Sequence, residues 1–339
     1  MGNSSFAREA TTPAVVTFTA NPSIDRTIAL GQALERGEVQ RATGVFEQAA
    51  GKGVNVAQVL FNAGVAVAVV AAAIDAPYRA LSDRAQTPLT VVGVPLKAPQ
   101  RVRVNTTITE PDGTTTKINE AGPELTSAQV ALAAEALTDV ARGASWVVLS
   151  GSLPPGAPVD WYATLAAAVR TDDTLVAIDT SGAALDAVLA ALPHAPFDLI
   201  KPNSEELAQL TGGDAAAFER AAAEGDLSGI VAAAATLRDR GIANVLVTLG
   251  GSGAVLVNAE GAWYGQAPRI DVASTVGAGD SSVAGFILAE VAGESAPACL
   301  ASAIAYGTAA ASLPGTTLPT RSDLPGAPVV TAVTLPHRV

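Results

Sequence analysis

Short apolar runs of strand length recur along the chain, and several are apolar throughout, which is typical of parallel strands buried on both faces. Alanine-rich segments of helical length lie between them. The runs are 14–20, 66–74, 145–151, 174–179, 198–203, 244–251 and 253–258, and the helical segments are 126–141, 159–170, 204–211 and 229–240. This alternation predicts an α/β fold with a central, mostly parallel sheet and helices on both faces. Ligands should bind beyond the carboxyl ends of its strands.

Two polar stretches, at about 25–49 and 100–122, interrupt the alternation. Both are rich in Thr, Val and charged residues, and "PDG" at 111–113 predicts a hairpin turn. We expect them to be lid strands that form a small antiparallel β-sheet over one edge of the main domain.

The extent of the domain follows from where the alternation holds. It runs over 14–315 without an internal repeat or a long linker, and a chain of 339 residues is long enough to bury a large core in one domain. We expect a single α/β domain over this range. The termini, 1–13 and 316–339, lack the pattern and are predicted to be irregular.

The composition argues against several classes of protein. Although 49% of the residues are apolar, no uncharged run reaches the roughly 18 residues that a membrane-spanning helix needs. The net charge of -12 disfavours binding to nucleic acid or to an anionic membrane, since both are held by clustered Lys and Arg. The single Cys299 excludes an internal disulfide, and two histidines give little support to a His-based triad or metal site. We expect a cytoplasmic protein.

The stretch "STVGAGDSSVAGF" at 274–286 is a turn of small residues that leads into a helix. Successive backbone N–H groups in such a turn, together with the helix dipole, favour an anion. Gly277, Ala278 and Gly279 are therefore candidates for an anion hole in which Asp280 is ionised. Two interpretations stay open. Asp280 is either an ordinary helix cap or a base that accepts a hydroxyl proton while the turn neutralises a phosphoryl group.

Two other nucleotide-binding patterns are absent. Lys52 in "AAGKGVN" is followed by Gly53 and Val54, so the Ser or Thr of a GxxxxGK[ST] loop is missing. No predicted strand leads into a full GxGxxG turn. In a chain with net negative charge, a bound phosphate must be held by local groups such as the turn at 274–286.

Five motifs occur together in a fixed order: "NPSID" (21–25), "AGKGVNVA" (50–57), "SGSLPPG" (150–156), "KPNSEEL" (201–207) and "STVGAGDS" (274–281). In order and spacing they resemble the ribokinase (PfkB-type) family of sugar kinases, and the resemblance covers roughly residues 14–315. Within that family, "AAGKGVNVAQVL", "RGEVQRA" and "RIDVASTVGAGDS" look most similar to 1-phosphofructokinases, with tagatose-6-phosphate kinases as near neighbours.

The resemblance implies an ATP site with Mg²⁺. Asp280 matches the catalytic base of the family, and Gly277, Ala278 and Gly279 match its anion hole. Glu206 and Asn203 match an N-x-x-E element that positions magnesium, although an acidic first turn is also ordinary at a helix start. The residues implied to bind ATP are Lys201, Asn203, Thr248, Leu249, Gly250, Gly251, Ser252 and Gly253.

The resemblance also implies a sugar-phosphate site. Lys52 and Arg103 are suited to a phosphate group, the first as a point charge and the second as a bidentate donor. Taken alone, Arg103 is more typical of a solvated edge strand, and Asp25 is more typical of a turn cap. The residues implied to bind the sugar are Asp25, Gly51, Lys52, Gly53, Asn55, Arg103, Asn105, Ser150 and Ser152. A glycine-rich turn usual in the family is missing at 71–84, which leaves the choice of sugar open.

These features predict an ATP-dependent kinase of a ketohexose phosphate, with fructose 1-phosphate converted to fructose 1,6-bisphosphate. Tagatose-6-phosphate or fructose-6-phosphate kinase is the alternative within the enzymes. A non-catalytic sugar-phosphate sensor on a kinase scaffold is the alternative of another class. A ribose or nucleoside kinase is disfavoured, because an uncharged substrate has no use for Lys52 and Arg103 together. The resemblance also implies a homodimer that pairs through the exposed lid strands.

Overall fold

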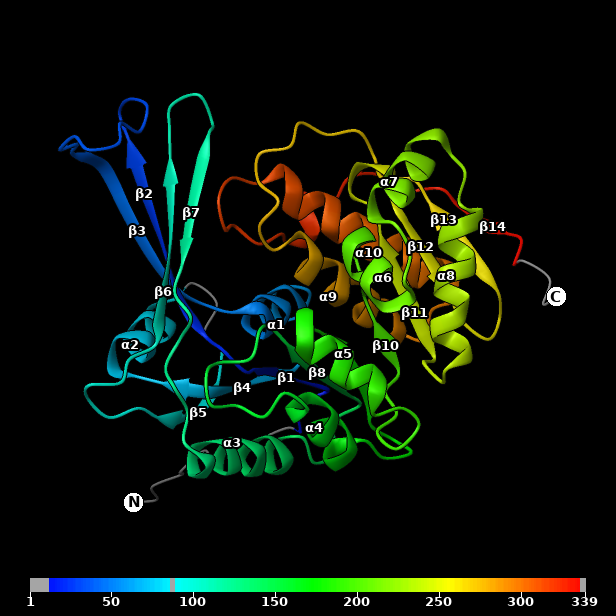
Figure 1. Cartoon of the computed structure of the whole chain (residues 1–339), viewed down its shortest axis with the longest axis horizontal. Coiled ribbons are helices and arrows are strands. Elements are labelled where there is room, and N and C mark those ends of the chain that lie inside the picture. The colour runs from blue at the N-terminus through cyan, green and yellow to red at the C-terminus, as the bar shows by residue number, and fades with distance from the viewer. Residues whose placement is uncertain (1–11, 86–88, 336–339) are drawn as a thin grey trace, which may run out of the picture.

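A ten-stranded sheet runs through the main body of the molecule (Figure 1). The computed structural model describes residues 12–85 and 89–335. The strands lie in the order β14-β13-β12-β11-β10-β9-β8-β1-β4-β5, parallel from β11 to β5 and antiparallel from β11 to β14. Their bounds are β1 Val15–Thr19, β4 Val67–Ile74, β5 Val91–Pro95, β8 Trp146–Ser150, β9 Leu175–Asp179, β10 Leu199–Ile200, β11 Asn244–Thr248, β12 Ala254–Val257, β13 Ala262–Gly265 and β14 Val330–Val333.

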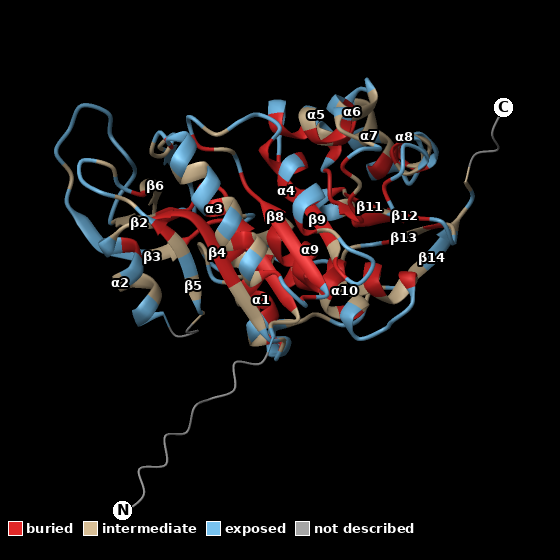
Figure 2. Ribbon diagram, turned by 90° about the horizontal axis from the view of Figure 1, so that it is seen from below, coloured by how far each residue is buried: buried red, intermediate tan, exposed pale blue. Residues whose placement is uncertain are grey.

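Helices cover both faces of this sheet, as the alternation predicts (Figure 2). The helices α1, α9 and α10 pack on one face, and α3, α4, α5 and α8 pack on the other. The bounds are α1 Lys52–Asn62, α2 Ala76–Arg84, α3 Ser127–Val140, α4 Trp161–Val169, α5 Gly182–Ala190, α6 Ser204–Thr211, α7 Ala215–Glu224, α8 Ser228–Asp239, α9 Ala278–Val291 and α10 Ala296–Ser312. None of the described helices has the length and apolar character needed to cross a membrane.

The central strands are apolar throughout because both of their faces are buried. In β1, Val16 and Phe18 join the core under α3 and α4, whereas Val15 joins the core under α1 and α9. Phe18 meets Trp161 edge to face with ring centroids 5.3 Å apart. Successive side chains of a strand point to opposite faces, so one short run supplies both layers of the core.

The lid is a separate four-stranded sheet in the order β3-β2-β6-β7, with bounds β2 Ser23–Leu30, β3 Ala42–Ala50, β6 Arg103–Thr109 and β7 Thr115–Asn119. Both predicted insertions therefore form strands. Each hairpin is antiparallel, but β2 pairs with β6 in parallel, so the lid is mixed rather than antiparallel as expected. The cause is topological: the first strand of each hairpin leaves the main body in the same direction (Figure 1).

The end of the chain differs from its expectation. The range 316–339 is predicted to be irregular, yet β14 pairs with β13 and extends the main sheet. The apolar and β-branched residues of Val330–Val333 suit an edge strand, and the Pro-rich residues before them obscured this signal. The range 1–13, apart from its last two residues, and the last residues 336–339 lie outside the described residues.

Candidate active site

A cavity of about 640 Å³ lies where the lid meets the carboxyl ends of the central strands. The last residues of β9 and β11, Asp179 and Thr248, line it, and so does Lys201 just after β10. The lid contributes Asp25 from β2 and Arg103 from β6, among others. The cavity is thus at the edge of the sheet where a parallel α/β fold binds its ligands.

Most of the residues implied by the motifs line this cavity. They are Asp25, Gly51, Lys52, Asn55, Arg103, Asn105, Lys201, Asn203, Glu206, Thr248, Gly250, Gly251, Gly253, Gly277, Ala278, Gly279 and Asp280.

Five implied residues do not line the cavity. Ser150 is fully buried within β8, and Gly53 is packed against Thr19 and Phe18. Ser152 is exposed, and its Oγ accepts a hydrogen bond from Asn21. Leu249 is buried, and the carbonyl oxygen of Ser252 accepts a hydrogen bond from the Tyr264 hydroxyl. Roles for these five in binding stay predictions.

The turn before α9 has the geometry of an anion hole. Gly277 is the N-cap with φ 77°, a left-handed conformation that favours glycine, and no side chain caps the helix. The first intrahelical hydrogen bond runs from the Ser281 N–H to the Gly277 carbonyl. The N–H groups of Ala278, Gly279 and Asp280 precede that bond, so they have no acceptor within the helix and are directed out of its N-terminus.

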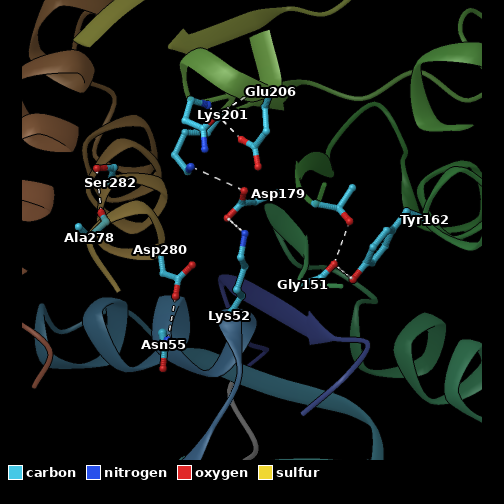
Figure 3. A network of polar contacts seen from close by, with 12 residues as sticks. Lys52, Asn55, Gly151, Tyr162, Asp179, Lys201, Glu206, Ala278, Asp280 and Ser282 are labelled. Atoms are coloured by element: carbon cyan, nitrogen blue, oxygen red, sulfur yellow. Dashed lines mark hydrogen bonds and ion pairs between the residues drawn. The ribbon is translucent and has the colours of Figure 1, made fainter. Parts of the chain in front are cut away.

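Asp280 is not the helix cap but the third residue of α9, and its carboxylate serves the cavity. Its Oδ2 accepts a hydrogen bond of 2.8 Å from Asn55 Nδ2 of α1 (Figure 3). Burial raises the pKa of Asp280 to about 6, against the opposing influence of Lys52. The sequence predicts a fully ionised group, and the difference arises because Asp280 is only 6% exposed. A base with a pKa near the working pH is suited to proton transfer.

Asp179 is a charged cavity residue that the sequence reasoning missed. Its side chain is 3% exposed and forms ion pairs with Lys52 (3.3 Å) and Lys201 (3.7 Å) (Figure 3). The two lysines lower the pKa of Asp179 despite its burial, and Asp179 raises the pKa of Lys52. Asp179 and Lys52 therefore both stay charged. The available signal was its position as the last residue of the buried run at 174–179, at the edge of the sheet where ligands bind.

The lid side of the cavity carries polar groups with unused hydrogen-bonding capacity. Asp25 accepts hydrogen bonds from Ser23 (2.8 Å) and Asn105 (3.2 Å), and burial raises its pKa. Arg103 donates to the Asn21 carbonyl at 2.9 Å. The Nε of Arg103 and the Oδ1 of Asn105 are buried and have no hydrogen-bond partner within 12–85 and 89–335. One is a donor and the other an acceptor, so a ligand with both kinds of group suits this wall.

Gly51 and Lys52 open α1 beneath the lid. Gly51 has φ 137°, and a Cβ there would lie 2.5 Å from the Thr19 methyl group, so the turn requires glycine. From this turn the Nζ of Lys52 donates to Asp179 Oδ2 at 3.3 Å (Figure 3).

The opposite side of the cavity is formed by small residues and a capped helix. Gly250 and Gly251 follow β11 and leave open space beside them, as the loop of a nucleotide site requires. Asn203 and Glu206 form a reciprocal capping box at the start of α6, with bonds of 2.8 and 3.0 Å. The structure is therefore compatible with both interpretations of this pair, the helix cap and the magnesium-positioning element, since both residues also line the cavity. No cluster of three or more His, Cys, Asp or Glu suited to a metal occurs among the described residues.

Comparison with known proteins agrees with this geometry. The model of the pfkB family carbohydrate kinases matches residues 19–323. The chain belongs to the pfkB family of carbohydrate kinases. As such it is a phosphotransferase with an alcohol acceptor. The match confirms the family expected from the five motifs, and the similarity to solved structures confirms the ribokinase-like fold.

Individual relatives of this pfkB kinase include two curated enzymes and a solved structure. The 1-phosphofructokinase of Xanthomonas campestris is 37% identical over 284 residues, which cover 81% of this chain and 83% of that enzyme. The 1-phosphofructokinase of Escherichia coli is 34% identical over 282 residues, covering 80% and 83%. The phosphofructokinase-2 of Escherichia coli in complex with fructose-6-phosphate is 25% identical with a TM-score of 0.79, covering 92% and 96%.

Proposed function

We propose that this kinase transfers a phosphoryl group from ATP to a ketohexose phosphate, and that its substrate is fructose 1-phosphate, giving fructose 1,6-bisphosphate. The observation that carries the proposal is the position of Asp280. Its buried carboxylate lies in the first turn of α9, beside the free N–H groups and within the cavity that Lys52 and Arg103 line. This arrangement supports a base, an anion hole and phosphate-binding cations within one cavity.

In the proposed reaction, Asp280 accepts the proton of the primary hydroxyl of the sugar, and this oxygen forms the new bond to the γ-phosphorus as the bond to the ADP oxygen breaks. The N–H groups of residues 278–280 donate to the equatorial oxygens, whose charge grows in the transition state. Lys201 and Lys52, held by Asp179, add positive charge nearby. The lid excludes water, which would otherwise compete with the sugar hydroxyl.

The residues present also fit ATP with Mg²⁺. Magnesium in proteins uses one or two carboxylates, with phosphate oxygens and waters as the remaining ligands. Glu206 at the cavity wall supplies such a carboxylate, and Asn203 lies beside it. Magnesium would neutralise phosphate charge there, while Thr248, Gly250 and Gly251 would border the nucleotide.

The choice of fructose 1-phosphate rests on two observations. Lys52 and Arg103 both lie at the lid side, where the unpaired Arg103 Nε suits an anion and Asn105 Oδ1 suits a hydroxyl. The two curated relatives above are 1-phosphofructokinases. Fructose 6-phosphate and tagatose 6-phosphate are the alternatives, since the solved relative binds fructose-6-phosphate. The intact base and anion hole favour an enzyme over a sugar-phosphate sensor.

The proposal is tested by measuring ADP release with Mg-ATP and a panel of fructose 1-phosphate, fructose 6-phosphate, tagatose 6-phosphate, fructose and ribose. We expect kcat/KM to be at least about a hundredfold higher for fructose 1-phosphate, a difference of about 2.7 kcal/mol in transition-state binding. A preference for another sugar phosphate would keep the chemistry and refute the substrate. Turnover of none of the five sugars would refute the proposed substrate class.

We also propose that the outer face of the lid pairs with a second copy of the chain. Val45, Ile28 and Ile108 form one row across the lid sheet, and this row faces away from the cavity-lining Asp25. Val45 is 61% exposed, as an unpaired apolar face would be. In sedimentation velocity at micromolar concentration, the wild type should therefore be a dimer and Val45→Glu a monomer. The equally exposed Phe46, on the opposite face, supplies the control Phe46→Glu, which should stay dimeric. A monomeric wild type would refute the dimer.

A further inference from the structure

The segment at 71–84, which lacks the family's glycine-rich turn, ends β4 and forms α2. Asp75 is the N-cap of α2, and its Oδ1 accepts the N–H of Tyr78 at 2.9 Å. Its other oxygen, Oδ2, accepts the N–H of Val102 at 2.9 Å. Val102 directly precedes β6, so one carboxylate joins the start of a helix to the root of a lid strand.

Tyr78 makes a second connection from α2 to the lid. Its side chain is 1% exposed, and its hydroxyl donates to the carbonyl of Ala50 at 3.3 Å. Ala50 is the last residue of β3 and is followed by Gly51 and Lys52. Burial raises the pKa of Tyr78, which keeps the hydroxyl protonated as a donor at neutral pH.

A small apolar cluster surrounds these two bonds. Tyr78, Ile74 and Ala71 pack with Ile24 of β2 and with Val102. The partly buried Ala49 of β3 and Val104 of β6 lie against them. This cluster is separate from the two large cores of the main sheet, and α2 lies against β3 at the foot of the lid (Figures 1 and 2).

We propose that Asp75 and Tyr78 are positioning residues that fix the roots of both lid hairpins and thereby set the sugar-phosphate side of the cavity. Asp75 holds Val102, the residue just before β6, and β6 carries Arg103 and Asn105. Tyr78 holds the carbonyl of Ala50, which directly precedes Gly51 and Lys52. The inference rests on the proposed function, since it assigns these cavity residues to the sugar phosphate. The replaced turn is then a specificity element: it holds Lys52 and Arg103 at a set separation.

Three variants separate positioning from simple stability. Tyr78→Phe removes only the hydroxyl. Asp75→Ser keeps a helix cap, because serine caps about as well as aspartate, but its shorter side chain does not reach Val102. Asp75→Ala removes both functions. The matched control is Thr174→Val, which removes a buried hydroxyl that donates to the Ala144 carbonyl at 2.8 Å, just before β9 and away from the cavity.

We expect Tyr78→Phe and Asp75→Ser to raise the KM for the sugar phosphate about fivefold, the effect of losing one hydrogen bond. The KM for ATP and kcat should stay within about twofold, since the α9 turn is unaffected. Asp75→Ala should show the same rise in KM with a further loss of thermal stability. Thr174→Val should change stability alone. An unchanged KM in the first two variants would overturn the proposal.

Hydrogen exchange supplies a readout that does not depend on turnover. In Tyr78→Phe and Asp75→Ser, peptides covering residues 49–53 and 101–105 should exchange faster than in the wild type, while those covering 277–283 should not. If the wild type phosphorylates no sugar, the proposed function fails, and the exchange data still test the lid roots. Exchange at wild-type rates at both roots would refute the positioning role.

Discussion

Asp280→Asn should lower kcat by about a thousandfold, a rise of about 4 kcal/mol in the activation barrier, because general-base catalysis contributes roughly 10²–10⁴. Asparagine keeps the volume and still accepts the hydrogen bond from Asn55, so binding of the sugar phosphate, measured by calorimetry, should remain within about threefold. At pH 8 the variant should be at least as stable as the wild type, since a buried charge is replaced by a neutral amide.

The control for this change is Asp271→Asn, which removes an exposed carboxylate shortly before the same turn. It should leave kcat unchanged. A wild-type kcat in Asp280→Asn would exclude Asp280 as the base, and a loss of binding equal to the loss of turnover would assign it to ground-state binding.

The same carboxyl sets the pH dependence of the wild type. Its pKa in the folded chain is about 6, above the ordinary value of 3.8, and only the ionised form accepts a proton. The kcat/KM should therefore be level above that pH and fall about tenfold per unit below it. The substrate phosphate also titrates near pH 6. Asn55→Leu distinguishes the two, since loss of the Asn55 bond raises the pKa of Asp280 and moves the acid limb to higher pH, whereas titration of the substrate is unaffected.

The sequence predicts the main sheet well because its strands are buried on both faces and read as unbroken apolar runs. It predicts the turn at 274–286 equally well, because small residues before an apolar segment are typical of a turn that leads into a helix. Whether Asp280 caps that helix or lines the cavity became clear only from the structure. The strands β5, β13 and β14 were missed, because strands of four or five residues at or next to an edge of the sheet carry little periodicity. The parallel pairing of the two lid hairpins was also missed, because local sequence encodes turns but not the order of distant strands.

In the candidate site, too, local motifs were predicted and contacts between distant segments were not. Glycine turns that match a motif were located residue by residue, whereas Asp179 was not, since it belongs to no local motif. Its role depends on Lys52 and Lys201, which reach it from α1 and from the end of β10. The hydrogen bonds of Asp75 and Tyr78 likewise join α2 to lid residues that lie far away in the sequence. Charge pairs and lid contacts of this kind arise only once the chain has folded.

Asp179→Ala should lower the free energy of unfolding by about 3–5 kcal/mol, because it leaves the ammonium group of Lys201 buried without its carboxylate. Lys201 is only 7% exposed, whereas Lys52 is 40% exposed and regains water more easily. The isosteric Asp179→Asn should lose less stability, since the amide oxygen still accepts from one lysine. Urea unfolding followed by circular dichroism measures both.

The kinetic consequence of Asp179→Asn separates electrostatics from folding. Asp179 raises the pKa of Asp280, while Lys52 and Lys201 lower it. Without the charge of Asp179, both lysines act on Asp280 unopposed, so its pKa falls and the acid limb of kcat/KM should move to lower pH. The matched control is Asp198→Asn, which breaks a similarly buried ion pair with Arg170, remote from the cavity. It should reduce stability and leave the limb in place. An unmoved limb in Asp179→Asn would show that Asp179 acts on the fold alone and not on the base.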